Sequence, residues 1–459
     1  MSDVSLIGAG EVTRNVLGGT DGYLFLQGGS HSEMEYLEGT RKPSDLSVRN
    51  FANNISSRRR YCHERGIRYS HVVYPSKAVV CKSHLAEPSR SSVASLYEQA
   101  YYPELDRSSR NSVLYPSGIL KKLGRPYRLH DTHLSHEGCV AVTDELFDKV
   151  GLGSVELSEI ATTTGDIIGD LSLMLGSDTK VSETIYKSFS RTEYIVDNSQ
   201  YLKGNTGGVT VCHNWAADRS SRILIMGDSF IRLSLYLFAA KARDVLYVRT
   251  PNFQPDLIEL FKPDVVITAN AERYMAEVDA DSNGDAALFE SFRLGRYENA
   301  DAYVAAIKAQ LSFRHHRSVY DQWRAEIMGR TMQLKSGIGY ILAVPNDQIS
   351  RSGSGSQFVS TGIDPQFRFY IPEKLLDGAI EVVVSMRSEV SSEAVIYASE
   401  YGTLFSAFSP ERRIRQNVSP GENRLIFTFD QGSFGRELRL DPLSRMGKFE
   451  IMDLTVKQI

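Results

Sequence analysis

The feature that most constrains this fold is an apolar run, residues 223–226, that stops at Gly227-Asp228-Ser229 before a helix-like segment, residues 231–243. A continuous apolar run of this length predicts a strand buried on both faces, which is typical of a parallel sheet covered by helices. A tight glycine turn between strand and helix exposes the side chain that follows. We therefore predict that Ser229 is a nucleophile whose developing negative charge is stabilised by the first N–H groups of the helix.

A serine nucleophile needs a base, and the segment Asp131-Thr132-His133 supplies one together with a carboxylate to orient it. With one residue between them, Asp131 and His133 are predicted to point to the same side of an extended segment. Each motif alone is weak evidence, because turns are rich in Gly, Asp and Ser. The alternatives are that Asp228 or Ser229 only caps the helix, and that Asp131-x-His133 is a polar strand end.

Helix-like and strand-like segments alternate through the first three quarters of the chain, which predicts an α/β domain with a parallel sheet flanked by helices. We place this domain at residues 20–335. It includes an insertion at about 151–220, rich in Thr, Ser and Gly, and a helical segment at about 284–335. The predicted strands are residues 22–26, 70–75, 127–129, 223–226, 245–248 and 265–268. The predicted helices are residues 44–65, 231–243 and one that Ser135 caps.

Residues 338–459 follow a different pattern. Short runs in which apolar and polar residues alternate are separated by turn residues, which predicts an all-β sandwich. Its aromatic residues are candidates for stacking on sugar rings, although they could equally be core residues that alternate inward. These aromatic residues are Tyr370, Tyr397, Tyr401, Phe405 and Phe408.

The bulk composition excludes some partners. A formal net charge of -4 in 459 residues gives no reason to expect a nucleic-acid or anionic-membrane partner. The sequence shows no apolar run of the length that a membrane helix needs and no secretion signal at its start, so we expect a cytoplasmic protein, or a periplasmic one if a leader was removed. The four cysteines are predicted to be reduced.

Three histidines spaced by three residues, His130, His133 and His136, raise the possibility of a metal site. A strand end that leads into a helix cap does not place three imidazoles on one face, and no carboxylate–histidine motif accompanies them. We therefore predict no metal and no bound cofactor.

Asp-Thr-His-x-Ser followed later by Gly-Asp-Ser-Phe resembles the alginate O-acetyltransferase family of the SGNH/GDSL-like superfamily. Three further stretches fit that family: residues 21–26, residues 73–77, and residues 262–267 running on to Glu-Arg-Tyr at 272–274. The order also fits, because ordinary GDSL hydrolases have the serine first, whereas this family has the permuted order with Asp-x-His first. The resemblance covers about residues 20–280.

The resemblance implies a polysaccharide or glycan O-acetyltransferase with a Ser-His-Asp triad and an acetyl-serine intermediate. The acetyl donor would be acetyl-CoA or a donor-delivering protein, and the C-terminal sandwich a carbohydrate-binding module. Asn270 is implied as an oxyanion donor beside the Ser229 N–H, and Arg273 and Tyr274 as substrate contacts. On physical grounds alone, these three could be an ordinary turn asparagine and ordinary helix-start residues. A carbohydrate acetylesterase with the same triad and a non-catalytic glycan-binding protein remain alternatives.

Overall fold

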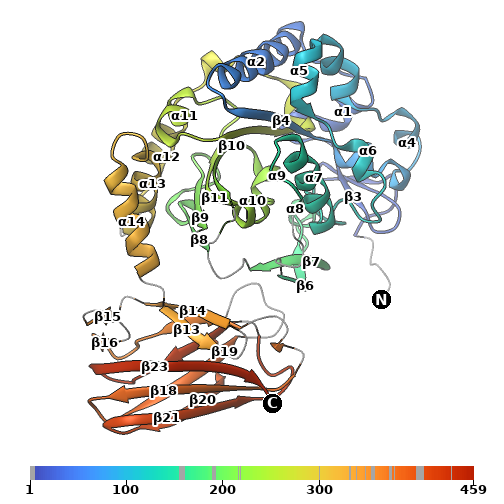
Figure 1. Ribbon diagram of the computed structural model, residues 1–459. Helices are drawn as coiled ribbons and strands as arrows, with labels where there is room; N and C mark the ends of the chain where they lie inside the picture. Colours follow the sequence, from blue (N-terminus) through green and yellow to red (C-terminus); the bar gives the residue numbers. More distant parts are fainter. Residues whose placement is uncertain are drawn as a thin grey trace. The chain divides into compact units, whose positions relative to one another are not determined.

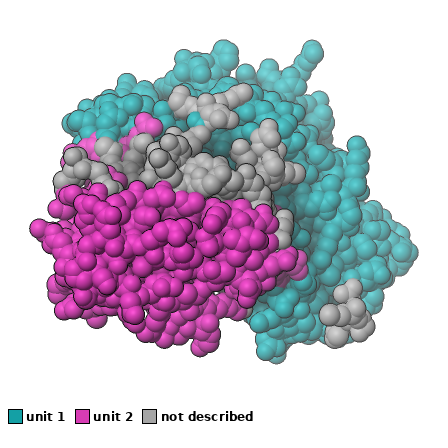
Figure 2. Space-filling view, turned by 60° about the horizontal axis from the view of Figure 1, so that its bottom comes forward, with its two compact units in different colours: residues 1–159, 166–184, 193–321 teal, residues 160–165, 185–192, 322–459 magenta. Residues whose placement is uncertain are grey.

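The computed structural model describes residues 6–154, 161–188, 193–214, 217, 219–298, 300–329, 332–336, 339–346, 348–352, 357–371, 375–376, 378–399, 408–435 and 437–459. The chain forms two compact units, coloured separately in Figure 2. Unit 1 comprises residues 1–159, 166–184 and 193–321, and unit 2 comprises residues 160–165, 185–192 and 322–459. The boundary between the units near residue 321 thus lies inside a helix, α14 (Arg317–Gly329). The sequence pattern changes later, near residue 338.

Unit 1 is built around a seven-stranded sheet with strand order β5-β4-β12-β10-β11-β9-β8 (Figure 1). The five strands from β5 to β11 pair in parallel, as the alternating pattern predicts, whereas β9 and β8 add an antiparallel edge. The antiparallel edge comes from the expected insertion. The strands are β4 (Arg68–Tyr74), β5 (Val113–Leu114), β8 (Glu193–Asp197), β9 (Val209–Asn214), β10 (Arg219–Gly227), β11 (Ala242–Arg249) and β12 (Val265–Ala271).

The helices that flank this sheet begin where the sequence signals predict. Ser44 caps α2 and Ser135 caps α7, each accepting a hydrogen bond from the N–H three residues on. The helices of unit 1 are α1 (Glu33–Leu37), α2 (Asp45–Glu64), α3 (Lys77–Val80), α4 (Ser89–Ser92), α5 (Arg107–Ser112), α6 (Ser117–Leu120), α7 (His136–Lys149), α8 (Asp170–Leu175), α9 (Ser229–Arg232), α10 (Leu235–Lys241), α11 (Pro255–Phe261), α12 (Ala287–Leu294) and α13 (Asp301–Leu311).

Two local predictions in unit 1 are wrong. The expected helix 231–243 is two short helices, α9 and α10, interrupted at Ser234, and its last two residues belong to β11, where Ala242 pairs with Arg219. The expected strand 127–129 is a loop with a single bridge between Tyr127 and Leu134. In both places tertiary pairing decides the backbone conformation rather than local propensity.

The N-terminal residues, expected to lie outside the domain, form part of it. β1 (Val12–Thr13), β2 (Val16–Gly18) and β3 (Leu24–Leu26) make a small antiparallel sheet. Val16 and Leu24 are buried against Leu171 of α8. The insertion contributes α8 and the two-stranded sheet of β6 (Ala161–Ile168) and β7 (Lys180–Ser188).

Unit 2 contains the predicted β-sandwich. One antiparallel sheet has the order β13-β14-β17-β22-β19-β20 and the other β15-β16-β23-β18-β21, and buried residues of both sheets share one core. The strands are β13 (Met332–Ser336), β14 (Gly339–Pro345), β15 (Ile349–Arg351), β16 (Gln357–Ser360), β17 (Phe367–Tyr370), β18 (Ile380–Ser388), β19 (Ser392–Ser399), β20 (Phe408–Val418), β21 (Gly421–Phe429), β22 (Glu437–Asp441) and β23 (Gly447–Gln458).

The structure describes only some of the candidate sugar-stacking aromatic residues of the sandwich. Tyr401 and Phe405 lie outside the described residues. The guanidinium of Arg439 lies 4.7 Å from the centre of the Tyr397 ring, so one face of that ring is already covered. All four cysteines are buried and free, and none of the helices among the described residues is long and apolar enough to cross a membrane.

Candidate active site

The nucleophile turn is positioned by the central strand of the sheet. β10 ends at Gly227, Asp228 caps α9, and Ser229 is the first residue of that helix. A side chain at position 227 would place its Cβ 2.9 Å from both the Ala269 carbonyl oxygen and Cγ2 of Ile231, so only glycine lets the turn lie this close to β12. As the first helical residue, Ser229 has a backbone N–H without an intrahelical acceptor.

Asp228 holds this turn in place. Its partly buried carboxylate accepts hydrogen bonds from the N–H of Phe230 at 2.9 Å and of Ala271 at 2.6 Å. Burial raises the pKa of Asp228, and the two N–H donors counteract part of that rise. The Tyr247 hydroxyl donates to the Asp228 carbonyl at 2.9 Å. The capping alternative therefore holds for Asp228, while the Ser229 hydroxyl is left to a different partner.

That partner is His133. Nε2 of His133 lies 2.8 Å from Oγ of Ser229, and Nδ1 lies 2.7 Å from Oδ1 of Asp131. The same carboxylate oxygen accepts the backbone N–H of His133 at 2.8 Å. An ionised carboxylate only accepts hydrogen bonds, so the proton resides on Nδ1 and Nε2 can accept the serine proton. The structure therefore brings the three predicted residues into one hydrogen-bonded chain.

Electrostatics keep the Asp131 carboxyl ionised. Burial alone would raise the pKa of Asp131, but the hydrogen bonds and the positive charge that His133 can carry outweigh burial and lower it well below its usual range. The ring of Phe230 lies against His133, with ring centres 4.8 Å apart, and restricts the imidazole on one side. Asp131 and Phe230 together orient the His133 imidazole so that Nε2 can accept the proton of Ser229.

The spacing predicts that Asp131 and His133 lie on an extended segment. This prediction is wrong, because both residues lie in a loop. The three histidines also have separate partners: Nδ1 of His130 lies 3.2 Å from Oγ of Ser172, and Nδ1 of His136 lies 2.7 Å from the Tyr236 hydroxyl. The imidazoles are therefore not gathered around one point in the way that a three-histidine metal site requires.

Asp170, at the start of α8, belongs to the site and was missed by the sequence analysis. Its carboxylate accepts the Thr132 N–H at 2.8 Å and the Thr132 hydroxyl, and its own N–H donates to Oδ2 of Asp131 at 3.3 Å. The signal available in the sequence, a Gly-Asp pair before a short apolar stretch, is too common to indicate a site. Only the fold places this residue of the insertion beside the triad.

Asp131, His133 and Asp170 could also supply ligands to a metal ion, because one ligand atom of each lies within 4.8 Å of the others. Both ring nitrogens of His133 are already engaged by Asp131 and Ser229. A cation bound through either nitrogen would have to break the hydrogen-bonded chain. The donor set therefore fits acid–base chemistry better than metal binding, and the prediction of no metal stays a prediction.

A cavity of about 810 Å³ opens at the carboxyl ends of the parallel strands, directly beside the nucleophile turn. Ligands commonly bind at this edge of open α/β sheets. Three pairs of residues at or near the carboxyl ends of β10, β11 and β12 contribute to its lining, together with residues of α1 and its surroundings. These pairs are Gly227 and Asp228, Arg249 and Thr250, and Ala269 and Asn270.

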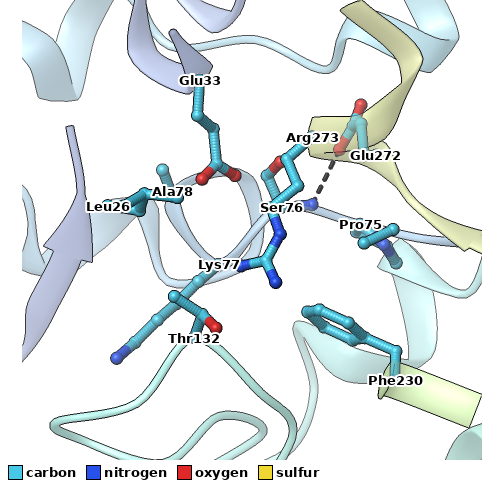
Figure 3. A pocket seen from close by; sticks show the side chains of 11 residues that line it. Leu26, Glu33, Pro75, Ser76, Lys77, Ala78, Thr132, Phe230, Glu272 and Arg273 are labelled. Atoms are coloured by element: carbon cyan, nitrogen blue, oxygen red, sulfur yellow. Dashed lines mark hydrogen bonds between the residues drawn. The ribbon is translucent and has the colours of Figure 1, made fainter. Parts of the chain in front are cut away.

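The three residues that the resemblance implies, Asn270, Arg273 and Tyr274, line cavities next to the nucleophile turn. Asn270 lines the cavity, its amide donates to the Ala271 carbonyl at 3.1 Å, and its side chain also forms a hydrogen bond with His71. Tyr274 also lines the cavity, and its ring packs edge-on against His31. Arg273 lines a smaller neighbouring cavity, with its guanidinium 5.3 Å from the Phe230 ring centre (Figure 3).

Comparisons with known proteins give only distant likenesses. Neither a protein-family model nor a curated protein matches the sequence. Among solved structures, a DHHW family protein from Eubacterium siraeum is 13% identical with a TM-score of 0.44, covering 59% of this chain and 94% of its own. The O-acetyltransferase domain of Pseudomonas putida AlgJ is 15% identical with a TM-score of 0.37, covering 59% of this chain and 95% of its own.

A third solved structure spans both units. Pseudomonas aeruginosa AlgX is 13% identical with a TM-score of 0.37 and covers 96% of this chain and 94% of its own. Similarities this low do not transfer an activity.

Proposed function

We propose that this chain is an O-acetyltransferase that transfers an acetyl group to a hydroxyl group of a polysaccharide or glycan. The observation that carries the proposal is the hydrogen-bonded chain from Asp131 through His133 to Ser229, beside a cavity of about 810 Å³. This constellation recurs on unrelated folds as the machinery of acyl transfer. The motif resemblance narrows acyl transfer to O-acetyl transfer.

The proposed reaction has two half-reactions. In the first, His133 takes the proton of Ser229 through Nε2 while Oγ attacks the acetyl carbonyl of the donor, and the protonated imidazole then gives this proton to the leaving group. Asp131 stabilises the imidazolium between these steps. The oxyanion is stabilised by the Ser229 N–H and, as the resemblance implies, by the Asn270 amide.

In the second half-reaction, a sugar hydroxyl enters in place of the leaving group. His133 removes its proton, the sugar oxygen attacks the acetyl-serine, and the proton returns to Ser229 as the ester leaves. The donor is acetyl-CoA or a protein that delivers the acetyl group, and Arg273 and Tyr274 contact the substrate. The C-terminal sandwich is proposed to hold the glycan as a carbohydrate-binding module.

The test is intact-mass spectrometry of the full chain after incubation with p-nitrophenyl acetate. We expect an adduct of one acetyl group on the wild type, accompanied by a burst of nitrophenol, and none on Ser229→Ala. The matched control is Ser282→Ala, which removes an exposed hydroxyl far along the chain from the triad and should leave the adduct intact. An adduct that persists in Ser229→Ala would refute the assignment of the nucleophile.

The same experiment separates the two rival functions. An acetylesterase has the same triad, but water takes the acetyl group, so the adduct would decay at the same rate with or without added glycans. An acetyltransferase would lose the adduct faster with the correct glycan and yield an acetylated sugar. A glycan-binding protein without activity would form no adduct with this ester or with a serine-reactive sulfonyl fluoride.

A further inference from the structure

Lys77 is a buried lysine whose ammonium group meets three backbone carbonyls. It begins α3, directly after the strand β4 and the turn at Ser76, and its side chain runs past Thr132 at the small cavity of Figure 3. Nζ donates to the carbonyl oxygens of Arg128 at 2.7 Å, Leu129 at 2.7 Å and Asp131 at 3.0 Å. An ammonium group has three donor hydrogens, so these three carbonyls use all of them.

Burying a lysine here costs the solvation free energy of its ammonium group, and packing of the side chain alone does not offset that loss. Only 5% of Lys77 is exposed, and the rings of Tyr23 and Phe25 lie beside Nζ, with centres 5.3 Å and 5.5 Å away. Burial disfavours the charged form and lowers the pKa of Lys77 to about 8. A buried ammonium is retained only where its hydrogen bonds repay the loss of solvation, and here all of those bonds go to one loop.

That loop carries the base of the proposed triad and has no regular secondary structure of its own. Its carbonyls at positions 128, 129 and 131 all accept hydrogen bonds from Lys77, and the carbonyl at position 129 also accepts the N–H of Leu24 in β3 at 3.0 Å. The third carbonyl is that of Asp131 itself, two residues before His133. A shift of about 1 Å in such a segment is enough to cost on the order of 10²-fold in rate.

We propose that Lys77 is a positioning residue: its ammonium group fixes the Arg128–Asp131 backbone so that Asp131 and His133 stay aligned with Ser229. The inference rests on the proposed function for its kinetic consequence. Its structural consequence, the alignment of the His133 ring with Asp131, can be observed without any turnover. Lys77 contacts no reacting atom and is not itself a catalytic residue.

The test uses three variants of the full chain. Lys77→Met keeps the length of the side chain and removes the donors, and Lys77→Arg keeps a positive charge with a different donor geometry. The matched control is Lys82→Met, since Nζ of Lys82 also donates to a backbone carbonyl, that of Val93 at 2.6 Å, but in a segment that carries no triad residue.

Two readouts are taken on each variant. The first is the rate of acetyl-adduct formation on Ser229 with p-nitrophenyl acetate. The second is the NMR signal of the His133 Nδ1–H proton, assigned by its loss in His133→Gln. The Nδ1 signal of His213, which lies 2.7 Å from Oδ1 of buried Asp244, serves as an internal reference for an intact fold.

For Lys77→Met we expect a rate loss of about tenfold to 10²-fold and a shifted or broadened His133 signal, with the His213 signal unchanged. Lys77→Arg should recover part of both, and Lys82→Met should change neither. A Lys77→Met variant with the wild-type rate and the wild-type His133 signal would overturn the inference.

Failure of the proposed function gives a different pattern. If the wild type forms no adduct, the proposed function fails, and the His133 signal alone then decides the role of Lys77. If Lys77→Met loses the His213 signal, it has not folded, and Lys77→Arg decides: an unchanged rate and an unchanged His133 signal would overturn the inference, and a change in either with His213 intact would support it.

Discussion

The two halves of the candidate site are held in different ways. The nucleophile turn is held by its immediate neighbours in the sheet. Gly227 ends β10, Asp228 caps α9, and the Asp228 carboxylate accepts the N–H of Ala271 at the end of β12. The loop that bears His133 lies outside the sheet and has fewer such neighbours. Backbone N–H groups of β3 and α8 donate to its carbonyls at positions 129 and 130, and charged side chains from distant parts of the chain, Lys77 and Asp170, also hold it.

This difference teaches which mutations the two halves should tolerate. Backbone bonds of a sheet and helix are built into unit 1 and cannot be removed by changing one surface residue. The base loop depends in addition on a few charge-assisted hydrogen bonds, each individually worth about 1.5–3 kcal/mol and each removable by one substitution. The base half should therefore lose alignment before the fold loses stability.

The largest expected effect comes from removing either half entirely. His133→Ala and Ser229→Ala should each lower turnover of an acetyl ester by ~10⁴-fold or more, and Asp131→Asn by ~10⁴-fold, because the triad acts as a unit. The double variant His133→Ala/Ser229→Ala should be no worse than either single variant. Steady-state rates on one ester measure this, and additive losses would show that the two residues do not act together.

The next effect compares two glycines, one in each half. Gly227→Ala places a methyl group 2.9 Å from the Ala269 carbonyl oxygen, and Gly169→Ala places one 1.9 Å from the His130 carbonyl oxygen. Overpacking of this kind costs about 1–3 kcal/mol. Gly227→Ala should lower both the free energy of unfolding and the rate, because it strains the central strand.

Gly169→Ala should act differently, since it pushes α8 and Asp170 away from the base loop. We expect a rate loss of at least tenfold with a smaller loss of stability than in Gly227→Ala, measured by urea unfolding and ester turnover. Equal stability losses in the two variants would show that the base loop is as firmly built into the fold as the nucleophile turn.

A smaller effect is expected for Asp170→Asn. The amide keeps an acceptor for the Thr132 N–H but loses the negative charge, and the difference between a charged and a neutral hydrogen bond, about 1 kcal/mol, corresponds to roughly fivefold in rate. Asp178→Asn, an exposed change in the same insertion, is the control. A wild-type rate for Asp170→Asn would assign Asp170 a packing role only.

The smallest effect is a change with pH that separates stability from alignment. The folded pKa of Lys77 is about 8, below its unfolded value of 10.5, so between these values the unfolded chain binds more protons than the folded one. The stability of the wild type relative to Lys77→Met should therefore rise from pH 8 to pH 10.5. The neutral amine has only two hydrogens for three carbonyls, so the rate should fall over the same range.

The groups that face Lys77 do not obscure this window. They are the carboxylates of Asp131, Asp170 and Glu183, together with the Cys81 thiol and the Tyr23 hydroxyl. Burial raises the pKa of Cys81 to about 11 and that of Tyr23 to about 12, so both remain protonated through most of it. Paired urea-unfolding and rate measurements are needed, and a rate that rises together with stability would contradict the positioning role.

Local sequence was enough to predict much of the fold, because the signals that it uses are local. The helix expected at residues 44–65, the cap at Ser135, the apolar strands of the parallel sheet and the alternating strands of the sandwich lie where their patterns indicate. Where tertiary pairing competes with propensity the pattern fails: residues 242–243 leave the expected helix to pair with β10.

What the sequence alone determined is the set of candidate residues and the nucleophile turn. Ser229, His133 and Asp131 are the residue types that acyl transfer needs, and the turn that exposes Ser229 is encoded by the residues on either side of it. What only the tertiary structure decided is which side chains contact the loop that carries His133. Asp170 lies 38 residues from Thr132 in the chain and Lys77 lies 54 residues from Asp131, with no local pattern to link them, and only folding brings their charges to the loop. Charge-assisted bonds across such separations leave no periodicity in a sequence, because the two partners are joined by the fold alone.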